Sequence, residues 1–288
     1  MTKKGWAMLA RGITREEVEA LLRTGDWVTE PKLDGIRARW SVGELFTRGV
    51  EGIWHKFPEI KGLGDHALDG EIVPMHGSFE TVAGRVAATG DYQNRATANP
   101  CRFVAFDAPN LALPLEARRE HLEQLRDRDL TTASVIPQSS DPNFIQTAMN
   151  FGMEGVVLKH RDSRYKPGVR SPMWRKLKFT QTVAVVAYSY EPGKGSRSDI
   201  GAVKIGVYEA RDKTTFFTQL GTVGSGFTAR QLQDLKTVLD MDRPQAIEVK
   251  TLGRTTSGKL RQPTFHRFRS DLDPVDCTYR EIAELPCY

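Results

Sequence analysis

The pattern of side chains changes near Thr180, and this change divides the 288 residues into two parts. Residues 1–180 mix helix patterns with short strand patterns and a hairpin, which predicts an α+β domain with mixed or antiparallel sheets. Residues 181–288 contain several strand patterns and a single evident helix pattern, at 228–239. Many strands with one helix are typical of a small closed barrel of the oligonucleotide-binding (OB) type. We therefore predict an α+β domain followed by an OB-fold barrel.

Local signals predict individual elements within this division. Thr14 and Glu17 form a potential capping box at the start of a helix that Gly25 ends. Alternation over residues 36–42, followed by Gly43, predicts a hairpin in which Val42 still belongs to the first strand. Further strands are predicted at 27–30, 71–73, 102–106, 156–159, 183–190, 202–209, 215–221 and 247–252, and helices at 115–127 and from a capping Asp141 to just before Gly152.

Composition narrows the classes of protein and of site. The formal charge is +5, from 41 Lys and Arg against 36 Asp and Glu, so a polyanionic partner is plausible. Three dispersed cysteines without C-x-x-C spacing give no support to a structural zinc site. The N-terminal sequence lacks the apolar core of a secretion signal, and no 18-residue apolar run occurs. We expect a cytoplasmic monomer without membrane contact.

Five short motifs occur in order along the first domain. They are Lys32-Leu33-Asp34-Gly35, Asp69-Gly70-Glu71, Phe106-Asp107, Glu154–Lys159 and Trp174–Lys178. Each has a plain structural interpretation, such as a turn, a core aromatic or a solvated helix end. K-x-D-G alone arises by chance in about one chain in ten at average composition. Five such coincidences in this order are far less probable than one shared cause.

In this order the motifs resemble those of the covalent nucleotidyltransferase superfamily, and most closely those of compact viral and bacterial ATP-dependent DNA ligases. A sixth motif, normally P-R-F-x-R-x-R-x-D-K, resembles residues 263–272, although Thr264 and Leu272 depart from it. The resemblance covers about residues 27–272 and implies a nucleotidyltransferase (adenylation) domain, 1–180, followed by an OB-fold domain, 181–288. With only about 26 residues before the first catalytic strand, we expect no separate N-terminal DNA-binding domain.

The motif chemistry predicts a lysine nucleophile. An amine that attacks a phosphorus must be neutral, whereas the pKa of free lysine is about 10.4. Burial and nearby cations disfavour the ammonium form, so Lys32 as nucleophile needs cationic neighbours, for which Lys176 and Lys178 are the candidates. Glu154 and Asp34 are carboxylates that could hold a divalent ion, Mg²⁺ or Mn²⁺.

Further nucleotide-binding roles are implied by the resemblance alone. They are ribose contact by Glu71, stacking of Phe106 on adenine, contact of Arg37 with the nucleotide or the DNA 5′-phosphate, a further conserved arginine at Arg48, recognition of the adenine amino group by the backbone at Glu30, and orientation of pyrophosphate by Arg267 and Arg269. Lys176 and Lys178 are also expected to contact the nucleotide.

These expectations combine into one function. ATP would adenylylate Lys32, AMP would pass to the 5′-phosphate of nicked double-stranded DNA, and the 3′-hydroxyl would expel it. Two basic segments, 158–180 and 251–269, are expected to contact DNA phosphates. The alternatives are an RNA ligase, a capping guanylyltransferase or a nucleic-acid-binding module with decayed catalysis; intact Lys32 and Glu154 argue against the last.

Overall fold

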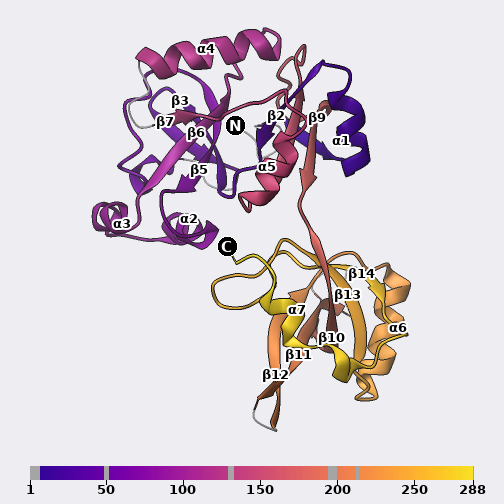
Figure 1. The fold of residues 1–288 in the computed structure, drawn as a ribbon. Helices are drawn as coiled ribbons and strands as arrows, with labels where there is room; N and C mark the ends of the chain where they lie inside the picture. Colours follow the sequence, from indigo (N-terminus) through magenta and orange to yellow (C-terminus); the bar gives the residue numbers. More distant parts are fainter. Residues whose placement is uncertain (1–6, 49–51, 129–132, 194–199, 212–213, 288) are drawn as a thin grey trace. The chain divides into compact units, whose positions relative to one another are not determined.

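The chain divides into two compact units, Met1–Phe179 and Thr180–Tyr288. The sequence-based boundary lies one residue later. The computed structural model describes residues 7–48, 52–128, 133–193, 200–211 and 214–287, which Figure 1 draws in colours that follow the sequence. Each unit has its own hydrophobic core.

The first unit is built on two β-sheets (Figure 1). The four-stranded sheet has the order β1 (Leu9–Gly12), β9 (Arg170–Lys178), β8 (Gly155–His160) and β2 (Trp27–Pro31), with β1 parallel to β9. The five-stranded sheet has the order β4 (Glu44–Thr47), β3 (Ile36–Ser41), β5 (Leu68–Pro74), β6 (Cys101–Asp107) and β7 (Ala133–Val135), with only β7 parallel to its neighbour. The mixed sheets confirm the predicted α+β class.

Helices of this unit are α1 (Arg15–Leu22), α2 (Phe79–Ala87), α3 (Tyr92–Ala98), α4 (Leu115–Arg128) and α5 (Phe144–Asn150), with a 3₁₀ turn at Trp54–Lys56. The predicted capping box of Thr14 and Glu17 is present at α1. The predicted cap of α5 was wrong: Asn143 holds the N-cap position, while the Asp141 carboxylate accepts a hydrogen bond from the Asn143 N–H at 2.8 Å.

The β3–β4 hairpin was predicted correctly, but its turn was not. Val42 has φ of 50° and Gly43 has φ of 76°, so both are turn residues. Positive φ at both central residues is the conformation of a type I′ two-residue hairpin turn. Val42 is 73% exposed, which places it outside the buried face that alternation assigned to it.

The second unit is a five-stranded antiparallel sheet in the order β12 (Thr214–Val223), β11 (Ile200–Arg211), β10 (Gln181–Pro192), β13 (Gln245–Thr251) and β14 (Thr264–Phe268). Helix α6 (Ala229–Asp240) packs on its core, but it is not the only helix as predicted, because α7 (Tyr279–Ala283) and a 3₁₀ turn at Pro274–Asp276 follow β14. Five residues are too few for a helical periodicity to be evident in sequence.

The two edges of this sheet approach each other at one end. The Leu260 N–H donates to the Leu220 carbonyl at 2.9 Å, and the Phe265 N–H donates to the Ser225 carbonyl at 2.9 Å. Backbone hydrogen bonds therefore link the end of β12 and the residues just after it to β14 and the segment that leads into it. Among the described residues, no helix combines the length and hydrophobicity needed to cross a membrane.

Candidate active site

A cavity of about 310 Å³ lies in the first unit, with strands of both sheets in its wall. Its lining residues are Leu9, Ala10, Glu30, Pro31, Lys32, Leu33, Arg37, Arg48, Glu71, Phe106, Ile136, Val157, Lys159, Arg170, Trp174 and Lys176. Seven of the predicted site residues are among them, and three others of this unit, Asp34, Glu154 and Lys178, are not. The fold thus gathers motifs that are up to about 145 residues apart in sequence.

Glycines of two motifs allow the backbones around this cavity to approach closely. A Cβ on Gly35 would collide with the Ile72 carbonyl, and a Cβ on Gly155 would collide with the Leu177 carbonyl. The Lys32 N–H donates to the Gly155 carbonyl at 2.8 Å, which ties the candidate nucleophile to the start of β8. The glycines of the K-x-D-G and E-G motifs are therefore required for steric reasons, because only a residue without a Cβ fits at these two positions.

Glu154 is the acidic centre of a lysine cluster. Its carboxylate lies 2.5 Å from the Lys32 ammonium and 3.2 Å from the Lys178 ammonium. Burial alone would raise the pKa of Glu154, but Lys32 and Lys178 together hold that pKa below its usual value. The pKa of Lys176 is lowered by burial and by the neighbouring charges of Lys178 and Lys32. Of the lysines around this carboxylate, Lys176 is therefore the one whose ammonium form is disfavoured.

Glu71 lines the same cavity in an unusual electrostatic state. Burial raises its pKa to about 8, and the opposing effects of Lys32 and Arg37 do not offset it. The folded protein therefore holds a proton on this carboxyl at neutral pH, whereas an unfolded chain releases it near pH 4.5.

This difference predicts a pH effect on stability. The pKa of Glu71 is higher in the folded protein than in the unfolded chain. The stability that protonated Glu71 contributes to the folded protein is therefore fully present below about pH 4.5 and is lost as pH rises through about 8. Glu71→Gln, which is always neutral, should gain melting temperature relative to wild type by roughly 3 °C or more between pH 5 and pH 9. Thermal melts of both proteins at each pH test this, and a constant difference would contradict it.

Arg37 is fixed by a buried acid behind it. Two hydrogen bonds of 3.0 and 2.6 Å join its guanidinium to Asp69, and the Tyr165 hydroxyl donates to the same carboxylate. The Arg37 guanidinium carbon lies 5.2 Å from the centre of the Phe106 ring and 5.9 Å from that of Trp174. This support orients one cation toward the cavity.

Lys159 and Trp174 were not assigned catalytic or nucleotide-binding roles from sequence, although both lie inside the motifs and Lys159 also belongs to the basic segment 158–180. Lys159 is 1% exposed, lies 2.8 Å from the Glu30 carboxylate and donates to the Phe106 carbonyl at 2.8 Å. Its ammonium lies 4.4 Å from the centre of the Trp174 ring. Residues two apart in a strand point to the same face. Lys159 therefore lies on the cavity side with Val157, and Trp174 lies there with Lys176, so strand periodicity could have predicted both positions.

The remaining predicted residues are placed differently. Arg48 is exposed at the rim of the cavity, while Asp34 is half-buried and is not among the lining residues. Arg267 and Arg269 lie in the second unit, where both contact Glu248, Arg267 at 3.0 Å and Arg269 at 3.5 Å. β14 ends at Phe268, so Arg269 follows the strand rather than belonging to it.

Comparison with known proteins now identifies the family. A family profile described as "ATP dependent DNA ligase domain" matches residues 7–178. The chain belongs to the ATP-dependent DNA ligase domain family. The predicted family is confirmed, and the nucleotidyltransferase-type fold of the first unit with it.

Relatives support the assignment over most of this chain. A multifunctional non-homologous end joining protein LigD of Mycolicibacterium smegmatis is 31% identical over 90% of this chain and 38% of its own length. A probable DNA ligase of Dictyoglomus thermophilum is 28% identical over 96% of this chain and 59% of its own length. This chain therefore spans about two fifths of the length of the first relative and about three fifths of the length of the second.

Solved structures show the same fold. A Lig E DNA ligase superposes with a TM-score of 0.69 at 23% identity, covering 92% of this chain and 99% of that one. The ligase domain of Mycobacterium tuberculosis LigD gives a TM-score of 0.51 at 26% identity, covering 96% and 99%.

Proposed function

We propose that this chain is an ATP-dependent DNA ligase that seals nicks in duplex DNA through AMP bound covalently to Lys32. The observation that carries the proposal is the position of the Lys32 amine, in a cavity of about 310 Å³ and 2.5 Å from the Glu154 carboxylate. A nucleophile with an acceptor for its proton inside a pocket is the arrangement that covalent nucleotidyl transfer requires.

The first step forms a bond between the Lys32 nitrogen and the α-phosphorus of ATP and breaks the bond to pyrophosphate. Glu154 is the nearest acceptor for the proton that Lys32 loses. In the second step AMP passes from Lys32 to the 5′-phosphate of the DNA. In the third, the 3′-hydroxyl attacks that phosphate and expels AMP. Lys176 and Lys178 neutralise the negative charge that develops on the phosphate oxygens.

The other lining residues would hold the nucleotide. Phe106 offers a ring for the adenine, Glu71 a carboxyl for the ribose and Glu30 the base-recognition position beside the nucleophile. Arg37 and Arg48 would contact phosphates of the nucleotide or of the DNA end. Each role is carried over from the family resemblance, and the shared cavity supports it.

Magnesium fits the donor set that this chain offers. No group of three His, Cys, Asp or Glu side chains in the described part of the chain is arranged to hold a metal. Glu154 nevertheless offers a buried carboxylate, whose Oε1 atom lies 3.2 Å from the Lys178 ammonium, and one or two carboxylates plus substrate phosphates are the usual magnesium site. Glu154 would hold the ion, with Asp34 as the second predicted ligand, and the ion would supply positive charge to the phosphates.

We further propose that the second unit is an OB-fold barrel. Its five antiparallel strands, one main helix and hydrogen-bonded edges support this. Arg267 and Arg269 would orient pyrophosphate during the first step. The enzyme would act as a monomer on nicked DNA.

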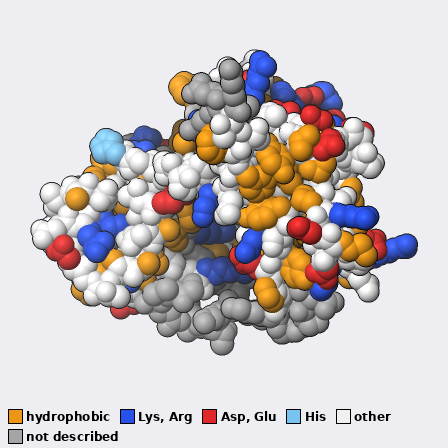
Figure 2. Space-filling view, turned by 90° about the horizontal axis from the view of Figure 1, so that it is seen from below, with side chains coloured by type: hydrophobic (Ala, Val, Ile, Leu, Met, Phe, Trp, Pro, Cys, Tyr) orange, Lys and Arg blue, Asp and Glu red, His pale blue; other side chains and the backbone are white. Residues whose placement is uncertain are grey.

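Contact with DNA phosphates predicts a steep effect of salt. Within segment 158–180, Lys159 is buried, so the exposed members such as Lys166 and Arg170 would contact the backbone. On the face drawn in Figure 2, Lys and Arg side chains lie among acidic and apolar ones rather than in one continuous block. Affinity for nicked duplex should fall about tenfold or more between 50 and 200 mM salt, with little dependence on sequence.

A filter-binding or anisotropy titration over salt concentration measures this slope. Lys166→Ala should lower the slope of log affinity against log salt by about one, and Lys61→Ala, an exposed lysine outside the segment, should leave it unchanged. A flat plot for wild type would contradict phosphate contact.

Mass spectrometry of the purified protein incubated with ATP tests the proposed function. A covalent adenylyl group on Lys32, followed by sealing of nicked duplex DNA, is the expected result. Labelling by GTP instead would favour a capping guanylyltransferase, sealing of RNA alone would favour an RNA ligase, and no adduct would favour a decayed site.

A further inference from the structure

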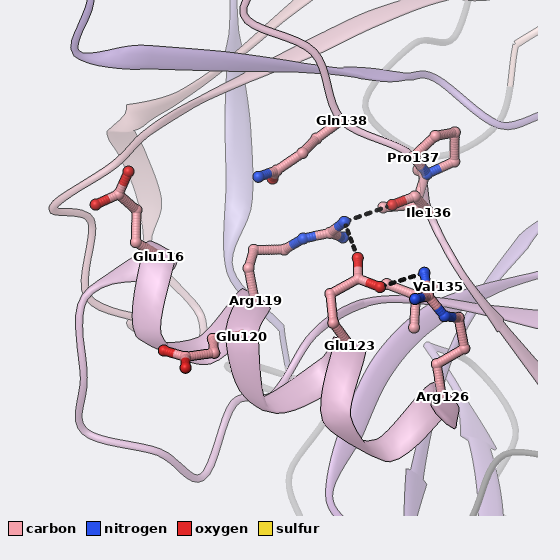
Figure 3. A pocket seen from close by; sticks show the side chains of 9 residues that line it. All are labelled: Glu116, Arg119, Glu120, Glu123, Arg126, Val135, Ile136, Pro137 and Gln138. Carbon is pink, nitrogen blue, oxygen red and sulfur yellow. Dashed lines mark hydrogen bonds and ion pairs between the residues drawn. The ribbon is translucent and has the colours of Figure 1, made fainter. Parts of the chain in front are cut away.

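A second cavity, of about 520 Å³, lies against helix α4 in the first unit (Figure 3). It is lined by one face of α4 and by the segment that follows β7, namely Glu116, Arg119, Glu120, Glu123, Arg126, Val135, Ile136, Pro137 and Gln138. Figure 3 shows Arg119 extending from α4 toward Ile136. Its Nη2 donates to the Ile136 carbonyl at 2.7 Å and to Glu123 at 3.0 Å.

Arg119 forms part of the wall between this cavity and the nucleotide cavity. Ile136 lines both cavities, and Glu30 lines the nucleotide cavity. The Arg119 Nη1 atom lies 3.9 Å from the Glu30 Oε1 atom. Arg119 is only 4% exposed although it carries a full charge, so its main electrostatic partners are these internal groups.

The two oxygens of Glu30 have different environments. Oε2 is paired with the Lys159 ammonium at 2.8 Å. Oε1 is buried without a hydrogen-bond partner in the described structure and faces the Arg119 guanidinium. A desolvated acceptor in a cavity wall is costly unless a bound ligand supplies a donor.

The charge of Glu30 depends on its two cationic neighbours. Burial raises the pKa of this carboxyl, Lys159 and Arg119 oppose that rise, and Asp107 adds to it. Removing either cation would therefore favour a protonated carboxyl, which donates a hydrogen bond where the carboxylate can only accept one. Protonation of Glu30 would therefore change which nucleotide base can form a hydrogen bond with Oε1.

We propose that Arg119 is a positioning residue that sets nucleotide-base selection, by holding Glu30 Oε1 as an acceptor for the exocyclic amino group of adenine. Adenine presents an amino donor at the position where guanine presents a carbonyl acceptor. An Oε1 atom that accepts a hydrogen bond, and donates none, therefore attracts the first base and repels the second. This inference rests on the proposed function, because it assumes that ATP occupies the Lys32 cavity.

The test compares covalent labelling of the enzyme by ATP and by GTP, with kcat and KM determined for each. In Arg119→Met the ratio of kcat/KM for ATP to that for GTP should fall about tenfold, mainly through KM for ATP, because Glu30 Oε1 is no longer held as an acceptor for the amino group of the base. Arg119→Lys keeps a cation and should retain most of the ratio. Arg126→Met, on the same helix and in the same cavity but paired with Glu123, is the matched control.

A double-mutant cycle separates positioning from general stability. In Glu30→Gln, a further Arg119→Met change should no longer alter the ATP to GTP ratio, because the acceptor that Arg119 holds is absent. If Arg119→Met does not fold, Arg119→Gln replaces it. An equal loss for ATP and GTP in a folded Arg119 variant would overturn the inference alone. A wild type labelled by GTP in preference to ATP would overturn the proposed function and the inference together.

Discussion

Lys32→Ala should abolish formation of the enzyme–AMP adduct, by at least about a thousandfold, and yet leave measurable sealing of a nick that already carries AMP. The Lys32 N–H donates to the Gly155 carbonyl at the start of β8, and the Lys32 ammonium lies 2.5 Å from the Glu154 carboxylate, against 3.2 Å for Lys178. In the proposed mechanism Lys32 acts as nucleophile in the first step only. The later steps would use a DNA-bound AMP and the other cations of the site.

Labelled ATP measures the first step, and pre-adenylylated nicked DNA measures the last. Lys61→Ala, an exposed lysine of the same unit that does not line the cavity, should behave as wild type in both assays. Equal loss in the two assays would show that Lys32 has a structural role instead. A persistent adduct in Lys32→Ala would show that another lysine is the nucleophile.

The motifs predicted which residues meet, but not what holds them there. The Phe106-Asp107 motif marked an aromatic for the base, whereas Asp107 is fully buried and forms two hydrogen bonds to Arg118, at 2.6 and 2.9 Å. Nothing near Arg118 in sequence distinguishes it from the exposed Arg126 of α4. Pairing across the fold decides which arginine is buried, and one sequence does not contain that pairing.

Local signals determined which elements were found. α1 was predicted because its capping box is strong, and the capping box is formed. α2 and α3 were missed: the Ser78 and Asp91 side chains before them make no capping hydrogen bond, and Asp91 has φ of 57°. These helices form because tertiary packing, such as that of Val82 in the core, outweighs weak local preference.

Burial shows that the purely structural interpretation of the Glu154 motif, a solvated helix end, was wrong. Glu154 was compatible with a solvated helix end, but it is 4% exposed and immediately precedes β8. Its charge is tolerated because Lys32 and Lys178 surround it. A carboxylate between two lysines is thus both the structural centre of the site and its most sensitive element.

Glu154→Ala should therefore reduce adenylylation by about a hundredfold or more. The change removes the acceptor 2.5 Å from Lys32 and leaves the Lys32 and Lys178 ammonium groups facing each other without a counter-charge. It also removes the carboxylate proposed to bind magnesium, so that the metal requirement should rise. Glu19→Ala, an exposed carboxylate on α1, is the matched control.

Glu154→Gln distinguishes the two causes. The amide keeps the shape and one acceptor oxygen, so it can still position Lys32, but it carries no charge for a metal or for the lysines. If positioning dominates, Glu154→Gln should recover most of the activity that Glu154→Ala loses; if charge dominates, both variants should remain defective at every magnesium concentration. Because Glu154 faces two lysines in a buried site, we expect the second result. A wild-type rate for Glu154→Ala across the whole magnesium titration would exclude Glu154 from catalysis and from metal binding alike.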